Sequence, residues 1–304
     1  MGALEALVNL EPMEKQLDIK KVKRIGGTSA GAIISTLLAV GYSIDEIKVI
    51  LKELDFSKFL DGKNGQALIQ LKSSLESNVI GFFSQLTNAI SNAKKLKTIL
   101  SELISNNGVL TGDFFRKWIE EKIKAKIGVK YATFQDLHKK IQSNSLLNGK
   151  DLFVVGTNLN LNKSEVFSYL DTPDLIISDA VRISMSIPIL FRPHQYYIRS
   201  ADGMSRLLKS DKIGDFYVDG GLLDNYPLWL FDNSKFIGQT SQNLNGTFFV
   251  NNQTLGFRLV SLNTKLDYEN SLNVISAIEG RGENNSNDSI NSIITFLMNI
   301  GNAL

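Results

Sequence analysis

A strand-turn-helix pattern at residues 22–40 limits the folds open to this chain more than any other feature of its sequence. A short β-prone run, Val22 to Ile25, ends in glycines, and the apolar, helix-compatible run Ala32 to Val40 follows. Ser29 lies at the turn between them, in the frame Gly27-Thr28-Ser29-Ala30-Gly31. This is the G-x-S-x-G spacing of a nucleophile elbow, in which a sharp turn lifts a serine hydroxyl out of a sheet. The pattern predicts an α/β fold with Ser29 as candidate nucleophile.

The residues on either side of Ser29 have a physical reason to be small. Gly27 and Gly31 stand two residues before and after it, where the backbone folds back so tightly that a Cβ atom is expected to clash. Ser29 also heads a helix, whose unpaired N–H groups and positive end favour negative charge. We therefore expect the backbone N–H of Ala30 to stabilise the oxyanion that forms when Ser29 attacks a carbonyl.

Composition excludes several classes of function. The 304 residues carry a net charge of only +2, which gives no reason to expect a nucleic-acid partner. The chain has no cysteine, so disulfide scaffolds, thiol catalysis and cysteine-bound metal sites are excluded. His138 and His194 are its only histidines, too few for a three-histidine metal site. We expect no metal and no cofactor.

The N-terminus indicates where the protein works. Residues 1–7 have no basic segment and no sustained apolar stretch, so they do not form a signal peptide. No part of the chain approaches the roughly 20 consecutive apolar residues of a membrane-spanning helix. We expect a cytoplasmic or peripheral membrane protein.

The remaining secondary structure fits an α/β domain. The clearest strand is Asp151 to Leu159, whose nearly continuous apolar run indicates burial on both faces, as in a parallel or mixed sheet. Helix signals occur in these segments: 2–10, 43–54 (opened by a capping box at Ser43), 111–123, 134–141 and 172–184 (opened by Thr172-Pro173). Shorter strands are expected at 166–170, 216–218 and 255–262, and residues 204–212 are expected to form a polar surface excursion.

Two segments are open to more than one interpretation. Residues 77–93 are uncharged and partly apolar, and Lys94, Lys95 and Lys97 follow them. This combination suits contact with an anionic membrane surface, although a core or dimer helix is the favoured interpretation. Residues 279–289 are polar and glycine-bearing, which predicts a mobile linker before a last apolar helix.

A serine nucleophile needs a base. Asp219 ends a short strand and is followed by Gly220 and Gly221, so its carboxylate can approach Ser29 closely, and burial would raise its pKa into a useful range. The alternative is the histidine-dependent arrangement, in which His194 is the base and an acid such as Asp151, Asp171 or Asp179 orients it.

With these motifs in this order, the chain resembles the patatin-like phospholipase family. The matching segments are the elbow at 27–31, Ser184-Met185-Ser186-Ile187-Pro188 with Phe191, Asp219-Gly220-Gly221, and Asn225-Tyr226-Pro227. The resemblance implies a three-layer α/β/α sandwich with a central, mostly parallel sheet, here a single domain over residues 1–304. It also implies a Ser29–Asp219 dyad that hydrolyses acyl esters of phospholipids or other lipids.

The sequence departs from the family in one respect. The family carries a glycine-rich oxyanion loop after its first strand, whereas this chain begins at the helix that follows the loop. Two functions therefore remain: a serine lipid acyl hydrolase of phospholipase A type, or a catalytically impaired member that binds lipid or a protein partner. Expected partners are a phospholipid and a peripheral membrane surface, with an activator or a second copy left open. The family includes toxins injected into host cells, so a secreted effector is a further alternative.

Overall fold

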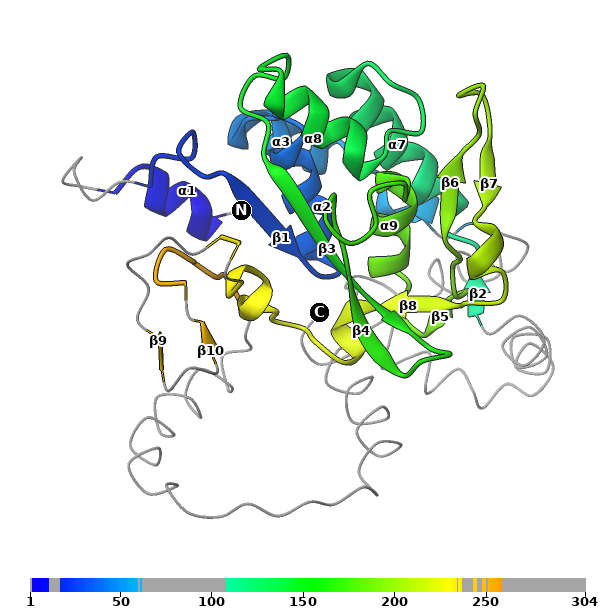
Figure 1. The fold of residues 1–304 in the computed structure, drawn as a ribbon. Helices are drawn as coiled ribbons and strands as arrows, with labels where there is room; N and C mark the ends of the chain where they lie inside the picture. Colours follow the sequence, from blue (N-terminus) through cyan, green and yellow to red (C-terminus); the bar gives the residue numbers. More distant parts are fainter. Residues whose placement is uncertain are drawn as a thin grey trace, which may run out of the picture. The chain divides into compact units, whose positions relative to one another are not determined.

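The computed structural model describes residues 2–10, 17–59, 61, 108–233, 235–236, 243–244, 248–249 and 251–258 (Figure 1). The chain divides into two compact units, one of Met1–Ile69 with Thr98–Gly256 and one of Gln70–Lys97 with Phe257–Leu304. The described residues belong almost wholly to the first unit. The segments 77–97 and 279–289 lie outside the described residues, so the expectations for them, and for a single domain over 1–304, stay predictions.

One strand organises the described sheet. β3 (Asp151–Asn158) is buried at every residue but its first, as its apolar run predicted. β4 (Lys163–Phe167) pairs antiparallel with Val154–Asn158 of β3. β1 (Arg24–Gly27) pairs in parallel with the first half of β3, and β8 (Tyr217–Asp219) pairs antiparallel with its last three residues. Because β4 occupies one edge of β3, β1 and β8 share the other edge.

The sheet is mixed rather than mostly parallel in the part of the chain that the structure describes. Only β1 runs parallel to β3, whereas β4 and β8 run against it. The reason for β4 is its connection: residues 159–162 alone join it to β3, and a turn that short permits only an antiparallel hairpin. The α/β class is confirmed, and the order of strands is β1-β3-β4 with β8 beside β3.

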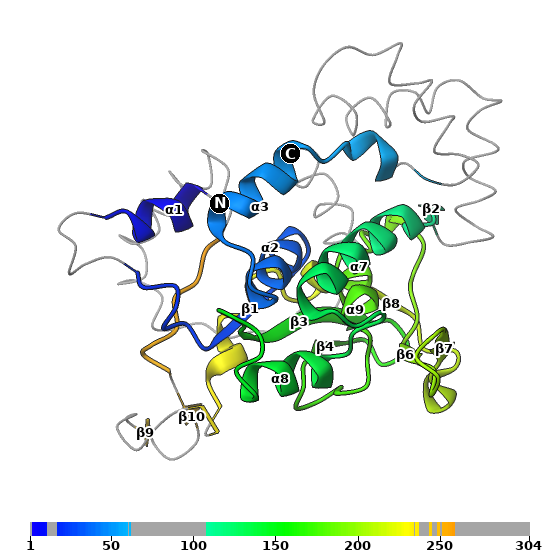
Figure 2. The ribbon, with the colours of Figure 1, turned by 90° about the horizontal axis from the view of Figure 1, so that it is seen from above.

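Helices pack on one face of this sheet. They are α2 (Ala30–Ala39), α3 (Ile44–Lys52), α7 (Asp113–Ile127), α8 (Phe134–Gln142) and α9 (Ile177–Ser184). All five contribute to one apolar core together with Leu152 and Val154 of β3. Figure 1 shows α2, α7, α8 and α9 together over the strands, and Figure 2 shows the same helices from above. On the opposite face, Phe153 and Val155 pack against Leu230 of the 3-10 helix η5 (Leu228–Phe231).

The other described elements are short. They are the helix α1 (Gly2–Val8), the 3-10 helices η2 (Phe56–Phe59), η3 (Ser210–Lys212) and η4 (Gly220–Leu222), the parallel pair β2 (Gly108–Leu110) and β5 (Ile189–Phe191), and the hairpins β6 (Tyr197–Arg199) with β7 (Arg206–Leu208) and β9 (Asn243–Leu244) with β10 (Phe248–Phe249). None of the helices in the described ranges combines the length and the apolar character that a membrane span requires.

Several expected boundaries were wrong, each for a tertiary reason. The helix expected from Thr172 begins only at Ile177, because Leu175 and Ile176 make isolated β-bridges with other segments. The strand expected at 166–170 is β4, three residues earlier. Residues 204–212 are not simply a polar excursion, since they contain β7 and the exposed side chains of Met204 and Leu207. Residues 255–258, the described part of the strand expected at 255–262, have no regular structure.

Candidate active site

Two strands meet head to head at the candidate site. β1 and β8 lie end to end along the same edge of β3 and run toward each other. The last residue of β1, Gly27, lies opposite Val154, and the last residue of β8, Asp219, lies opposite Gly156. These partners on β3 are two residues apart, which is roughly 7 Å along a strand. The register therefore brings the turn after β1, with Ser29, beside the carboxylate at the end of β8.

The turn at Ser29 has the strained backbone of an elbow. Ser29 has φ 54° and ψ −125°, in the positive-φ region that residues other than glycine rarely adopt. The turn is closed by two backbone hydrogen bonds, from Gly31 N–H to Thr28 O (2.9 Å) and from Ala32 N–H to Ser29 O (2.9 Å). Strain of this kind persists only where the surroundings enforce it, and it concentrates at functional sites.

The two elbow glycines differ in what they allow. A Cβ at Gly27 would overlap the carbonyl group of Gly31, so only glycine permits the start of α2 to approach β1. A Cβ at Gly31 would meet no described atom within 4 Å outside the backbone of its own helix. The steric reason expected for both glycines therefore holds at Gly27 and is wrong at Gly31, which borders open space next to Ser29.

Asp219 is a buried carboxyl group with a perturbed pKa. Its exposure is only 4%, and this burial raises its pKa to about 6 from an ordinary value of 3.8. A hydrogen bond with the Ser29 side chain and one from the Gly221 N–H (2.7 Å to Oδ1) act in the opposite direction. No cation pairs with this carboxylate among the described residues. Desolvation therefore dominates, and the group is a stronger base than an exposed aspartate.

The backbone around Asp219 is fixed on both sides. Its N–H donates to Ser186 O (2.9 Å), and its carbonyl accepts from the hydroxyl of Thr157 on β3 (3.0 Å). A Cβ at Gly220 would overlap the carbonyl group of Val155, so glycine allows η4 to turn against β3. The second glycine, Gly221, supplies the N–H that binds the Asp219 carboxylate. Gly220 thus permits the turn after Asp219, and residue 221 supplies a backbone hydrogen bond to its carboxylate.

The end of α9 contacts the elbow, which the sequence did not reveal. The Ser29 N–H donates to the hydroxyl oxygen of Ser184 (2.9 Å), and the Ser184 hydroxyl donates to Val155 O of β3 (2.7 Å). The Sδ atom of Met185 lies 3.9 Å from the Ser29 Oγ. Serines at the end of a helix commonly bond to nearby backbone groups. Ser186 does so, donating to Arg182 O (2.7 Å), but Ser184 binds the candidate nucleophile's own peptide group.

One backbone donor beside Ser29 has no partner in the described part of the chain. Among the first N–H groups of α2, those of Gly31 and Ala32 already bond within the turn. Ala30 is exposed, and its N–H makes no bond to a described residue. It is therefore available, at the positive end of α2, to bind an oxyanion.

Both histidines bind aspartates elsewhere. His194 Nε2 lies 2.7 Å from Asp179 Oδ1, and Arg206 also pairs with that oxygen. His138 Nδ1 lies 2.7 Å from Asp151 Oδ1, and its ring stacks on Tyr169. Of the three acids considered for His194, the structure selects Asp179.

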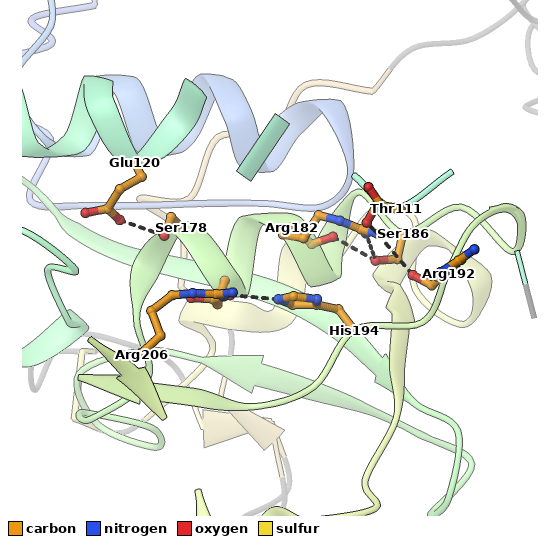
Figure 3. Close-up of polar contacts among 9 residues, drawn as sticks. Thr111, Glu120, Ser178, Arg182, Ser186, Arg192, His194 and Arg206 are labelled. Atoms are coloured by element: carbon orange, nitrogen blue, oxygen red, sulfur yellow. Dashed lines mark hydrogen bonds and ion pairs between the residues drawn. The ribbon is translucent and has the colours of Figure 1, made fainter. Parts of the chain in front are cut away.

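The His194–Asp179 pair is separated from the elbow along α9. Asp179 and Ser184 are five residues apart, about 7.5 Å of helical rise. Figure 3 shows His194 and Arg206 at one part of the helix and Arg182 with Ser186 at another. In the described residues, Ser29 contacts Ser184, Met185 and Asp219, and the structure brings neither histidine to it.

A groove of about 510 Å³ lies along β4, on a different part of the molecule. Lys163, Lys209 and Trp229 are among the residues that line it, whereas Ser29 and Asp219 are not. Three of its lysines pair with acidic side chains, Lys163 with Glu165 among them. No group of three or more potential metal ligands occurs within the described ranges.

Comparisons with known proteins give the family. A family model described as Patatin-like phospholipase matches residues 1–232. The uncharacterized protein R571 of Acanthamoeba polyphaga mimivirus is 32% identical over 81% of this chain and 61% of its own length. The probable lipid hydrolase 463L of Invertebrate iridescent virus 6 is 25% identical over 75% of this chain and 57% of its own length. The crystal structure of VipD from Legionella pneumophila covers 95% of this chain and 56% of its own, with 18% identity and a TM-score of 0.41.

This chain therefore spans about three-fifths of the length of the curated relatives that it matches. The matched family model covers both the elbow and Asp219 and extends over most of the chain. The chain belongs to the patatin-like phospholipase family.

Proposed function

We propose that this chain is a serine lipid acyl hydrolase of the phospholipase A type, with Ser29 as nucleophile and Asp219 as general base. Membership of the patatin-like phospholipase family supports lipid hydrolase activity in general. The observation that carries the finer proposal is the head-to-head meeting of β1 and β8. It sets a strained serine beside a buried carboxylate whose pKa is raised to about 6.

The first half of the reaction forms an acyl-enzyme. Ser29 Oγ attacks the ester carbonyl carbon while its proton passes to the Asp219 carboxylate, and the carbonyl oxygen becomes an oxyanion beside the Ala30 N–H. When the tetrahedral intermediate collapses, the ester C–O bond breaks and Asp219 returns the proton to the leaving alcohol. The lysolipid leaves, and the acyl group stays on Ser29.

Water completes the cycle by the same route. Asp219 accepts a proton from a water molecule that attacks the acyl carbonyl, and returns it to Ser29 Oγ as the fatty acid leaves. A base with a pKa near 6 is mostly deprotonated at neutral pH and still accepts a proton more readily than an exposed aspartate. No step needs a metal ion or a cofactor. The substrate partner is a phospholipid or another acyl lipid, met at a peripheral membrane surface.

Covalent labelling tests the nucleophile directly. A fluorophosphonate probe should form one adduct, located on Ser29 by mass spectrometry, and Ser29→Ala should abolish it. Ser35→Ala, on the same helix with its hydroxyl bonded to Gly26 O (2.7 Å), is the matched control and should retain labelling. Release of fatty acid from phosphatidylcholine vesicles should follow the same order.

The outcome also separates the two functions left by the sequence. A folded wild-type protein that binds vesicles but gives neither an adduct at Ser29 nor fatty acid would favour the catalytically impaired lipid binder. An adduct on another residue would refute the assignment of Ser29.

A further inference from the structure

We infer that Ser184 is a positioning residue for the elbow: its hydroxyl holds the Ser29 peptide group in the strained conformation from which Ser29 can react. The inference rests on the proposed function, because it assigns Ser184 a role in the reactivity of Ser29. Ser184 does not touch the reacting atoms and acts only through Ser29. Neither the family match nor the relatives' descriptions give this residue a role.

The geometry of the Ser184 hydroxyl is fully determined. The side chain has no exposure to solvent, and its one proton is donated to Val155 O at 2.7 Å. The hydroxyl oxygen then presents a lone pair to the Ser29 N–H, at 2.9 Å. One hydroxyl thus joins α9, β3 and the elbow. Without it, the part-buried Ser29 N–H and the buried carbonyl of Val155 would each lose this partner, which is costly away from water.

The bond acts on the part of Ser29 that is strained. A hydrogen bond to the N–H of Ser29 restrains the plane of the Thr28–Ser29 peptide, and the φ of 54° is the rotation about the N–Cα bond that joins this plane to the rest of Ser29. Of the two bonds that close the turn, the one from Gly31 N–H holds the carbonyl end of this peptide, Thr28 O, from within the elbow. Among the described contacts, Ser184 holds its N–H end and is the partner that ties the peptide to another element, α9.

Ser184 can serve as a fixed point because α9 is itself firmly held. Gly156 of β3 allows the close approach of α9, since a Cβ there would lie 2.7 Å from Ile183 Cγ2. The buried Arg182 donates to the carbonyls of Thr111 (2.6 Å) and Arg192 (3.1 Å), one residue beyond the paired strands β2 and β5 (Figure 3). Ser178, at the other end of the helix, donates to Glu120 at 2.7 Å and makes no described contact with the elbow, so it is not one of these anchors.

The orientation of the Ser29 peptide affects both the base and the oxyanion donor. The orientation of the Ser29 residue decides whether its Oγ faces Asp219 and whether the next N–H, that of Ala30, faces the oxyanion. If the Thr28–Ser29 peptide rotates, both alignments change together. Small losses of alignment at a nucleophile have large effects on rate, because reaction requires near-attack geometry.

Three variants of α9 test the inference in the full chain. Ser184→Ala removes the hydroxyl, Ser184→Thr keeps it, and Ser178→Ala removes an equally buried hydroxyl from the same helix without affecting the elbow. The rate of fluorophosphonate labelling at Ser29 should fall about 10- to 100-fold in Ser184→Ala. Ser178→Ala should stay within about twofold of wild type, and Ser184→Thr should recover most of the rate.

A second measurement does not depend on activity. Amide hydrogen exchange at Ser29 should accelerate at least about tenfold in Ser184→Ala and stay unchanged in Ser178→Ala. Should Ser184→Ala fail to fold, Ser184→Cys fills the site with a somewhat larger side chain, replaces the hydroxyl by a weak hydrogen-bonding group and should show the same two changes.

Two results would overturn the inference. One is a rate of labelling at Ser29 that falls equally in Ser184→Ala and Ser178→Ala, with each loss in proportion to the drop in melting temperature of that variant. The other is unchanged exchange at Ser29 in a folded Ser184 variant. If the wild-type protein forms no adduct at Ser29, the proposed function fails. The exchange of the Ser29 amide still tests Ser184 in that case, because an unchanged rate in Ser184→Ala would refute its positioning role independently of activity.

Discussion

Asp219 and Asp179 are equally deeply buried carboxylates in very different surroundings. Asp179 has no exposure and is paired with two groups that carry or accept positive charge, Arg206 and His194. Asp219 has 4% exposure and receives, from the described residues, only a hydroxyl and a backbone N–H, and burial raises its pKa to about 6. A compensated buried charge belongs to the architecture, whereas an uncompensated one near a strained serine is a candidate for chemistry.

The two sites also lie on different supports. Asp179 is on α9 and ties that helix to His194 and to β7 through Arg206. Asp219 is the last residue of a strand that ends where the elbow begins. We therefore propose that Asp179 holds the scaffold and that Asp219 takes part in the reaction. Each of these two roles can be tested by replacing a charged side chain with a neutral one.

The largest expected effect is on catalysis. Asp219→Asn should lower kcat/KM for phospholipid hydrolysis by about 10³, because the amide cannot accept the Ser29 proton. Asp179→Asn should lower the melting temperature but leave kcat/KM per folded molecule within severalfold of wild type. Vesicle hydrolysis and thermal unfolding, measured on the same samples, give both quantities. A loss of activity in folded Asp179→Asn equal to that in Asp219→Asn would return the base to the His194–Asp179 pair.

The next effect concerns the scaffold. Arg206→Met removes the cation that compensates Asp179 and should cost about 3 kcal/mol of unfolding free energy, since a buried carboxylate loses a partner. Lys209→Met breaks a more exposed pair with Asp174 (3.0 Å) and should cost no more than about 1 kcal/mol. Chemical denaturation of both variants measures the difference. Equally small losses of unfolding free energy in both variants would mean that Arg206 does not stabilise the buried Asp179. Asp179 would then not differ from Asp219 in having a compensated charge.

What the sequence could predict depended on how local each signal was. The capping box at Ser43 and the helix α3 are confirmed, and so is the buried strand β3, because caps and apolar runs act within a few residues. The elbow was predictable for the same reason, since a glycine-framed serine between a strand and a helix allows few conformations. The roles of Ser29 and Asp219 stay predictions, although the structure brings the two together.

What the sequence could not predict depended on packing between distant elements. The bond from Ser29 to Ser184 joins residues 155 positions apart and requires that α9 lie close on β3. The start of α9 was misplaced because Thr172-Pro173 has helix-start chemistry, yet Leu175 and Ile176 are drawn into bridges with other segments. The one available signal for the close approach was Gly156, a glycine inside a buried strand, which often marks such a contact.

Asp219 should also reduce stability at the pH where it works. Its folded-state pKa is raised, so its contribution to stability is fully present below the ordinary value of 3.8 and is lost as pH rises through about 6. Replacing it by Asn removes this loss. We expect Asp219→Asn to be more stable than wild type at pH 8, by up to about 3 kcal/mol, and to lose that advantage near pH 4. Denaturation at the two pH values checks this, with Asp215→Asn as control. Destabilisation at pH 8 as large as at pH 4 would contradict an uncompensated carboxylate.

The smallest effect is the pH dependence of the rate, and it distinguishes the two candidate bases when temperature is varied. The base must be deprotonated, so kcat/KM should be level above about pH 7 and fall below pH 6, reaching about a tenth of its maximum at pH 5. Burial lowers the pKa of His194 from 6.5, so an imidazole base could give a similar midpoint. The midpoint alone therefore does not identify the group.

The temperature dependence of the midpoint does identify it. Ionisation of a carboxyl group absorbs little heat, whereas that of an imidazolium absorbs much more, so only an imidazole midpoint shifts strongly to lower pH on warming. For Asp219 we expect a midpoint that is nearly constant between 15 and 35 °C, roughly the range over which a mesophilic domain stays folded. The same midpoint should persist in His194→Gln. A midpoint that falls on warming and disappears in His194→Gln would assign the base to the histidine, with Asp179 as its partner, and would leave Asp219 without the role of base.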